Sequence, residues 1–328
     1  MNGGGGMKLG YDKALYLLPF DHRQSYVTEM FHFEPPLDAS QRDQVIASKQ
    51  LIYEGFRQAL SEGVPFEAAG ILVDEQFGAA ILRDARQRGC VTALSVERSG
   101  TDEFEFEYSA DFAGHIEAFD PTFAKVLVRY NPDGDPALNL RQVGRLKQLS
   151  EYCQRNQRRF MFELLVPPTD EQLAQAGGNK EVFDGQARPL LMQRALRVLQ
   201  DAGIEPDVWK VEGLDLHADG ERLVQIARRG GRDQVGCIVL GRGADDAKVR
   251  GWLTVAAGVP GFIGFAVGRT SFWDAVSGYR AQTLTRAAAA TQIAGRLREW
   301  VDVFESGRLA SVACANPMAM LSARPASE

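Results

Sequence analysis

Residues 160–165 have the sequence FMFELL and residues 208–211 have the sequence VWKV, and a pattern of helical period, Leu190–Ala202, lies between these two short runs. A short run rich in apolar residues, then a helical pattern, then a second such run is typical of a strand, a helix and a parallel strand. The same alternation continues in both directions along the chain. This unit therefore predicts an α/β protein with a parallel sheet.

Six further runs complete the pattern, and eight strands in this arrangement predict a single (β/α)8 TIM barrel. The alternative is an open doubly wound sheet, which usually carries a glycine-rich dinucleotide loop after its first strand. Here the first strand runs into PFDHRQ, residues 19–24, without a glycine. The predicted strands are Leu15–Phe20, Gly70–Val73, Val91–Val96, Lys125–Val128, Phe160–Leu165, Val208–Val211, Cys237–Leu240 and Phe262–Val267. The predicted helices include Ser40–Ser61, Ala79–Gln87, Leu138–Gln157, Leu190–Ala202, Gly220–Arg229 and Asp245–Ala256.

The composition is typical of one large globular domain. The chain has 328 residues, of which 45% are hydrophobic, and a net charge of -6, whereas a general nucleic-acid binder is basic. The four cysteines form no C-x-x-C pair, a pattern that favours a reducing cytoplasm over a disulfide framework or a zinc site.

No signal segment is expected at the start of the chain, and the longest apolar stretch, residues 253–267, is too short to span a membrane. We predict a tag-like leader at 1–6, a single (β/α)8 domain at 7–313 and a flexible tail at 314–328. We also predict a cytoplasmic protein that binds neither nucleic acid nor membrane.

Polar residues follow the predicted strands at the end where parallel barrels build their active sites. A purely structural core does not need polar groups at each strand end, so the pattern favours a catalytic cavity. The residues concerned are Asp21, His22 and Arg23 after the first strand, Asp74 and Glu75 after the second, Glu97 and Arg98 after the third, Arg129, Glu163, Lys210 and Glu212 on the next three, and Gly241, Arg242, Gly268 and Arg269 after the last two.

Two lysines, Lys125 and Lys210, lie inside strand patterns, whereas most of the others lie in helical or loop patterns where we expect exposure. A charged amine inside a parallel strand costs several kcal/mol unless it is paired or neutralised. Burial and a second nearby cation both favour a neutral amine, which can attack a ketone, and arginine cannot replace it. The alternative for each lysine is an ion pair that serves packing.

Glu163 lies in the most apolar of the predicted strands. Burial raises and a lysine neighbour lowers the pKa of such a carboxylate, a combination that suits a proton shuttle. The alternative is a structural partner of a barrel lysine.

Gly241-Arg242 and Gly268-Arg269 follow consecutive strands, at the two loops where barrels commonly bind phosphate. Glycine allows close backbone approach, arginine offers forked donors, and Thr270 and Ser271 are expected to cap the helix that follows. The alternative is a pair of glycine turns with solvated arginines.

The four histidines have no H-x-x-x-H spacing, so we predict neither a metal nor another cofactor. The alternative is a magnesium site made by the carboxylates Asp74, Glu75, Glu97 and Glu212.

The sequence also resembles the class I tagatose-bisphosphate aldolase (LacD-like) superfamily, and within it the aldolase-like domain associated with 5-dehydro-2-deoxygluconokinase of myo-inositol catabolism. The segments that carry the resemblance are LYLLPFDHRQSY, GILVDEQFG, KVLVRYNPDGD, FMFELLVPP, PDVWKVEG, IVLGRG and GFIGFAVGRTSFWDA. The resemblance implies a class I aldolase in which Lys210 forms the Schiff base, Glu163 is the acid and base, and Lys125 is a second active-site lysine.

The family's Asp-x-Arg segment corresponds to Asp21-His22-Arg23, where the sugar aldolases more often have Gln in place of His22. This departure puts the tagatose substrate in doubt. For the inositol-pathway version, the resemblance implies cleavage of 2-deoxy-5-keto-gluconate 6-phosphate to dihydroxyacetone phosphate and malonate semialdehyde. The carboxylate of that substrate needs a further cation, for which Arg23, Arg98 and Arg129 are unranked candidates.

Three functions therefore compete. The favoured one is a Schiff-base aldolase acting on this phosphorylated keto sugar acid, or on tagatose bisphosphate or a related ketose phosphate. The others are a metal-dependent lyase or isomerase and a non-catalytic sugar-phosphate sensor. A homo-oligomer and a functional link to a sugar-acid kinase are further expectations.

Overall fold

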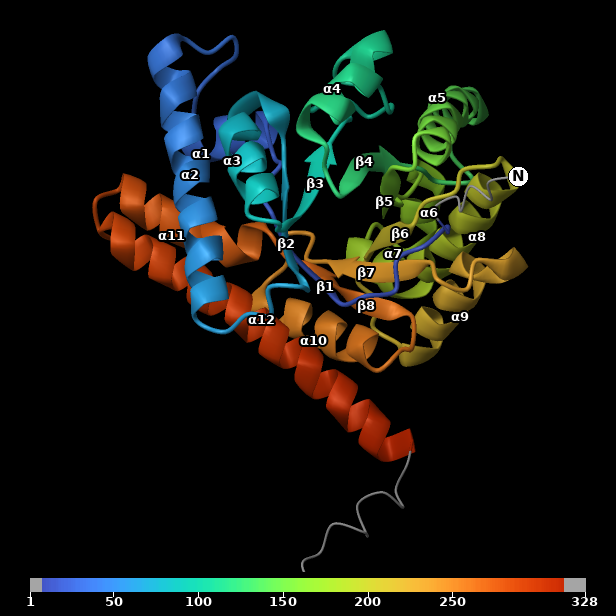
Figure 1. The fold of residues 1–328 in the computed structure, drawn as a ribbon. Helices are drawn as coiled ribbons and strands as arrows, with labels where there is room; N and C mark the ends of the chain where they lie inside the picture. The colour runs from blue at the N-terminus through green and yellow to red at the C-terminus, as the bar shows by residue number, and fades with distance from the viewer. Residues whose placement is uncertain (1–7, 316–328) are drawn as a thin grey trace, which may run out of the picture.

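The eight predicted strands close into a parallel barrel in sequence order, from β1 beside β2 to β8 beside β1, which confirms the (β/α)8 prediction (Figure 1). The computed structural model describes residues 8–315, so the predicted leader at 1–6 and the tail from 316 onward lie outside it. The strands are β1 (Leu15–Pro19), β2 (Ala69–Val73), β3 (Val91–Ser95), β4 (Phe123–Arg129), β5 (Arg159–Leu165), β6 (Val208–Glu212), β7 (Gly236–Leu240) and β8 (Phe262–Ala266).

Helices surround the barrel, and each of the six predicted helices is present with ends shifted by a few residues. Side-chain caps fix several starts: Asp74 accepts a hydrogen bond from the Phe77 amide at 2.8 Å at the start of α3. The helices are α1 (Gln24–Phe31), α2 (Ala39–Ser61), α3 (Glu75–Gln87), α4 (Phe112–Phe119), α5 (Pro136–Arg155), α6 (Asp170–Gln175), α7 (Lys180–Gln186), α8 (Arg188–Asp201), α9 (His217–Ala227), α10 (Asp246–Ala257), α11 (Arg269–Arg280) and α12 (Arg286–Ala315), with 3-10 turns at Ser109–Asp111 and Arg229–Gly231.

Two apolar cores follow from the alternation of side chains along each strand. The inner core fills the lower part of the barrel and includes Leu17, Leu72, Ala93, Met161 and Ile238. The larger outer core lies between the strands and the surrounding helices. Because the inner core closes the barrel below, the polar groups are confined to the carboxyl ends of the strands.

The barrel closes between β8 and β1, where Gly264 is in register with Leu15. A Cβ atom on Gly264 would lie 1.8 Å from the carbonyl oxygen of Leu15. Glycine is therefore required for the last strand to approach the first, because this neighbour is backbone and cannot rotate away.

Helix α12 packs across α2, α10 and α11 and extends beyond the barrel (Figure 1). It was not among the predicted helices, although its buried residues Ile293, Leu297, Trp300 and Phe304 follow a helical spacing. The alanine-rich segment around them weakens that pattern. None of the described helices is long and apolar enough to cross a membrane.

Candidate active site

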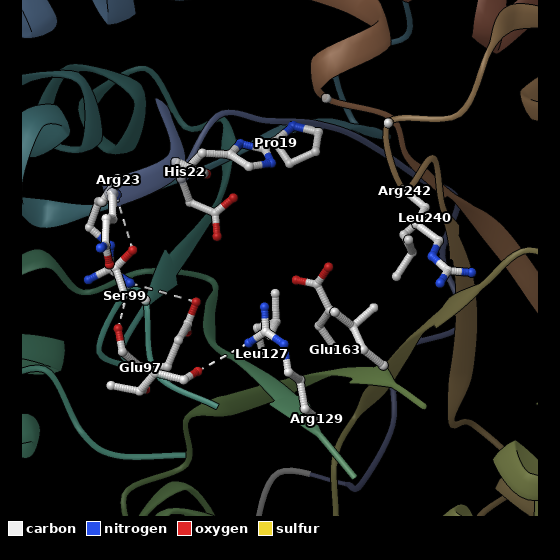
Figure 2. Close-up of a pocket in the computed structure, with 18 of the residues that line it drawn as sticks. Pro19, His22, Arg23, Glu97, Ser99, Leu127, Arg129, Glu163, Leu240 and Arg242 are labelled. Atoms are coloured by element: carbon white, nitrogen blue, oxygen red, sulfur yellow. Dashed lines mark hydrogen bonds and ion pairs between the residues drawn. The ribbon is translucent and has the colours of Figure 1, made fainter. Parts of the chain in front are cut away.

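A cavity of about 620 Å³ opens at the carboxyl ends of the strands. Its walls include Asp21, Glu97, Glu163, Lys210 and Gly268, which come from β1, β3, β5, β6 and β8 or the loops that follow them. Figure 2 shows labelled residues from both sides of the barrel turned toward this opening. The cavity therefore lies where the sequence analysis placed a catalytic site.

Lys125 is fully buried at the base of this site and is surrounded by carboxylates. Its Nζ lies 2.8 Å from Asp21 Oδ2, 2.9 Å from Glu97 Oε1 and 2.8 Å from Glu163 Oε2. Burial alone would lower the pKa of the Lys125 amine, but the three carboxylates outweigh it and raise the pKa well above its usual value. Lys125 is therefore a permanent cation at neutral pH.

Lys210 shares Glu163 with Lys125. Its Nζ lies 2.8 Å from Glu163 Oε1, so one carboxylate bridges the two amines through its two oxygens. The register explains this geometry, since Glu163 on β5 is paired with Lys210 on β6 and both side chains point into the barrel. Within residues 8–315, Glu163 is the only carboxylate that pairs with Lys210, and both side chains line the cavity.

Burial and the lysines act in opposite directions on the carboxylates. Burial raises the pKa of Glu163, but Lys125 and Lys210 outweigh burial and lower it below its usual value. Burial also opposes ionisation of Asp21, yet Lys125 and further cations hold its pKa well below the usual range. For Glu97, burial outweighs Lys125 and Arg23, so its pKa is raised. Glu163 is thus an ionised carboxylate in direct contact with Lys210.

A third buried lysine is the exception, among the described residues, to the expectation that lysines outside the strands are mostly exposed. Lys49 on α2 is fully buried, forms an ion pair with the buried Asp74, and donates a hydrogen bond to the carbonyl oxygen of His22 at 3.0 Å. A sequence signal was present, because residue 49 lies on the same helical face as the buried Val45 and Ile52. Lys49 thereby fixes the loop that follows β1.

His22 is half-buried, lines the cavity and packs edge-on against Phe272, with ring centroids 6.2 Å apart. Burial lowers the pKa of His22 to about 4, and the nearby Lys210 and Lys49 lower it while Asp21 and Glu163 oppose them. The imidazole is therefore neutral at neutral pH.

The arginines at the mouth differ in how far carboxylates already occupy them. Arg23 lies 2.8 Å from Glu107 and donates to the Glu97 carbonyl at 2.5 Å, so it serves the loop itself. Arg242 lies 2.8 Å from Asp184 and 3.1 Å from Glu212.

Three further arginines line the mouth, and of these Arg98 lies 2.7 Å from Glu105. Arg269 pairs with Glu29 and stacks on Trp273 at 4.3 Å. Arg129 donates to the Thr101 carbonyl at 3.2 Å, and its only carboxylate neighbour among the described residues is the exposed Asp102 at 4.0 Å. Arg129 is therefore the least neutralised arginine of the wall.

The loop after β8 approaches β1 closely. A Cβ atom on Gly268 would lie 2.3 Å from the carbonyl oxygen of Pro19, so no side chain fits there. The expected caps are wrong: the Ser271 hydroxyl donates to the Val267 carbonyl at 2.7 Å and the Thr270 hydroxyl to the Ala244 carbonyl at 3.0 Å. The start of α11 therefore has no side-chain cap in the structure. Helix α11 begins directly after β8, at the position where other barrels commonly bind phosphate.

A family model described as "Uncharacterized protein conserved in bacteria (DUF2090)" matches residues 8–308. The chain belongs to this family. The match spans all eight strands of the barrel and therefore includes the residues that line the cavity. A comparison of the DUF2090 chain with curated protein sequences finds no match.

Two solved structures share the fold of this DUF2090 chain. The crystal structure of Cgl0159 from Corynebacterium glutamicum has a TM-score of 0.53 and 16% identity, covering 89% of this chain and 88% of that one. An archaeal fructose 1,6-bisphosphate aldolase has a TM-score of 0.51 and 14% identity, covering 86% of this chain and 94% of that one. At identities this low, the structural similarity shows a common fold and nothing more.

The carboxylates of the alternative magnesium site do not meet in the DUF2090 barrel. Each pairs with a basic side chain instead: Asp74 with Lys49, Glu75 with His115, Glu97 with Lys125, and Glu212 with Arg188 and Arg242. In the part of the chain that the structure describes, no group of three or more acidic, histidine or cysteine residues is arranged to hold a metal ion.

Proposed function

We propose that this DUF2090 protein is a class I aldolase in which Lys210 forms a Schiff base with the ketone of a phosphorylated sugar-like substrate. One observation carries the proposal: Lys210 lines an open cavity and shares an ionised carboxylate, Glu163, with a second lysine that is buried and permanently charged. An amine free to reach a carbonyl, beside a group that moves protons, is what covalent catalysis on a ketone requires.

The proposed reaction uses Glu163 as the proton carrier. Glu163 takes a proton from Lys210, whose neutral amine then adds to the ketone to give a carbinolamine. Glu163 returns the proton to the hydroxyl, which leaves as water and gives the iminium. The carboxylate next removes the proton of the β-hydroxyl, the C–C bond breaks, and its electron pair moves into the iminium to give an enamine and an aldehyde. Protonation of the enamine and hydrolysis release the second carbonyl product and Lys210.

Lys125 has a different role in this proposal. It is fully buried and is not among the described residues that line the cavity, so it is unsuited to holding the substrate's phosphate. Its charge keeps Glu163 ionised and therefore ready to accept the first proton. The phosphate instead fits the amides beyond Gly241 and Gly268, with Arg242 and Arg269 at the rim.

For the substrate we propose 2-deoxy-5-keto-gluconate 6-phosphate, cleaved to dihydroxyacetone phosphate and malonate semialdehyde, with tagatose bisphosphate or a related ketose phosphate as the alternative. The sequence resemblance supports this choice, and so does Arg129, which offers its guanidinium to a carboxylate on the side of the barrel away from β8. A sugar-acid kinase would supply the phosphate ester. We place this chemistry in the cytoplasm, where the free buried thiols of Cys90, Cys153 and Cys237 stay reduced.

Trapping the imine tests the mechanism. The full-length protein is incubated with dihydroxyacetone phosphate, reduced with borohydride, digested and analysed by mass spectrometry. We expect an adduct on the peptide that contains Lys210. Lys210→Met removes the adduct, whereas Lys248→Met, which changes an exposed lysine away from the cavity, retains it. An enzyme that turns over while its Lys210 peptide stays unmodified by borohydride would refute the Schiff base.

A further inference from the structure

Three consecutive residues after β1 are each fixed by a different buried group. Asp21 is held by Lys125 at 2.8 Å, the His22 carbonyl by Lys49 at 3.0 Å, and Arg23 by the Glu97 carbonyl at 2.5 Å. The His22 ring also packs against Phe272. A loop restrained at each residue presents its side chains in one arrangement, which is the preorganisation that recognition requires.

Within this rigid loop, the His22 ring makes no hydrogen bond to any described residue, and its Nδ1 is shut off from solvent. A buried polar atom without a partner is costly and calls for an explanation. The tautomer with its proton on Nδ1 would bury an N–H that has no acceptor. The proton therefore belongs on Nε2. His22 therefore offers an N–H donor while it remains uncharged, because its pKa is lowered to about 4 by burial and by the neighbouring lysines.

The position of His22 indicates which part of a ligand it meets. In the closed barrel β1 lies beside β8, and the loop at Gly268 touches the end of β1. His22 is thus on the phosphate-loop side of the cavity, and Figure 2 shows it and Glu163 on facing sides of the opening. A ketone bound to Lys210, with its phosphate arm toward β8 and its far end toward Arg129, keeps the carbon next to the ketone between Glu163 and the wall that includes His22.

We propose that His22 is a specificity-determining residue: its neutral ring donates a hydrogen bond to a hydroxyl on the carbon next to the ketone of the bound substrate. The enzyme therefore selects α-hydroxy ketone phosphates over ketone phosphates that lack this hydroxyl. A neutral donor suits an uncharged hydroxyl, whereas the anionic ends of the substrate are left to amides and arginines. This inference rests on the proposed Schiff-base function and adds to it the chemical group that the β1 loop recognises.

Two ketones that differ only in this hydroxyl test the proposal: dihydroxyacetone phosphate and hydroxyacetone phosphate. Each is titrated into the protein, reduced with borohydride, and the modified fraction of the Lys210 peptide gives a half-saturating concentration. The readout is the ratio of the two concentrations. Because that ratio is compared between proteins, the intrinsic reactivity of each ketone cancels.

We expect wild type to favour dihydroxyacetone phosphate, and His22→Leu to reduce this preference roughly tenfold, the effect of losing one hydrogen bond to a buried polar site. His22→Gln restores an uncharged donor and retains most of the preference. His217→Leu, the same change at an exposed histidine on α9, leaves the ratio unchanged. Circular dichroism confirms that each variant is folded.

One result overturns the inference alone: a folded His22→Leu protein that keeps the wild-type ratio, as expected if only water meets the ring. If neither ketone modifies Lys210 in folded wild-type protein, the proposed aldolase function fails and this inference fails with it. The two kinds of failure are distinguishable because the first still yields an adduct.

Discussion

Replacement of Lys125 by methionine tests the electrostatic arrangement of the site without assuming a substrate. In the folded protein three buried cations, Arg23, Lys125 and Lys210, face three buried carboxylates, Asp21, Glu97 and Glu163, and Arg23 also pairs with the partly exposed Glu107. Methionine retains most of the aliphatic stem of the lysine and removes its charge. The variant therefore leaves an excess of one buried negative charge and changes the packing little.

The expected cost follows from the burial of the partners. Removing one member of a buried ion pair typically costs about 3–5 kcal/mol, since the remaining charge is left without compensation. Lys125 is fully buried and each of its carboxylate partners is less than one tenth exposed, so the full range applies. The exposed pair of Lys248 and Asp215 sets the comparison, because removing an exposed partner costs at most about 1 kcal/mol.

The cost must also depend on pH. Asp21 and Glu163 have pKa values below their usual range in the folded protein, so they stabilise it above the unfolded pKa of about 4 and lose that contribution as the pH falls below it. Lys125→Met removes most of this contribution. The difference in unfolding free energy between wild type and variant is therefore largest near neutral pH and shrinks as the carboxylates become protonated in acid.

Urea unfolding followed by circular dichroism, at several values between about pH 3 and pH 7, measures this difference. Lys248→Met is the matched control. Lys125→Met combined with Glu97→Gln restores the charge balance and is expected to recover part of the lost stability. If Lys125→Met costs no more than Lys248→Met, or costs the same at every pH, the buried charge network does not stabilise the fold as argued.

Two further predictions concern the mouth of the barrel. Gly268→Ala sets a Cβ atom 2.3 Å from a backbone carbonyl of β1, so it should lower the free energy of unfolding by about 1–3 kcal/mol and weaken binding of phosphorylated ketones. Gly251→Ala on α10 is the control: its Cβ meets nothing within 4 Å, so it should raise the free energy of unfolding by up to about 1 kcal/mol. Thermal unfolding and imine trapping measure both. On the proposed function, Arg129→Met should raise KM for a substrate with a terminal carboxylate roughly tenfold to hundredfold, while Arg98→Met, whose guanidinium is already 2.7 Å from Glu105, changes it little. If the two arginine variants raise KM equally in steady-state assays, Arg129 is not the arginine that binds the carboxylate.

The barrel could be predicted because its signal is local and repeated. Each strand is a short run such as FMFELL, and its length and position within the repeat identify it even when a charged residue such as Glu163 interrupts it. Helices α1 and α6 have eight and six residues, too few for a helical period to stand out, and the alanine-rich α12 lacks a contrast between its faces. They were missed for that reason.

The site could be predicted only in part, because strand position shows which side chains point inward and not which of them meet. The sequence indicated Lys125, Glu163 and Lys210 as inward-facing groups. It did not indicate that one carboxylate bridges both amines, since that depends on the register between β5 and β6. Lys49 was missed because a charged residue in a helical pattern was expected to be exposed, although it shares a face with Val45 and Ile52.

The shared carboxylate restricts how the proposed reaction can start. Lys125 keeps its proton and Glu163 is ionised at rest, so Glu163 can only accept a proton at first, and its nearest donor on the cavity side is Lys210 at 2.8 Å. Once protonated, Glu163 remains beside the carbinolamine that forms on the same amine, and can return that proton to the departing hydroxyl. One proton then serves both steps, and the charge of Lys125 sets the direction in which it first moves.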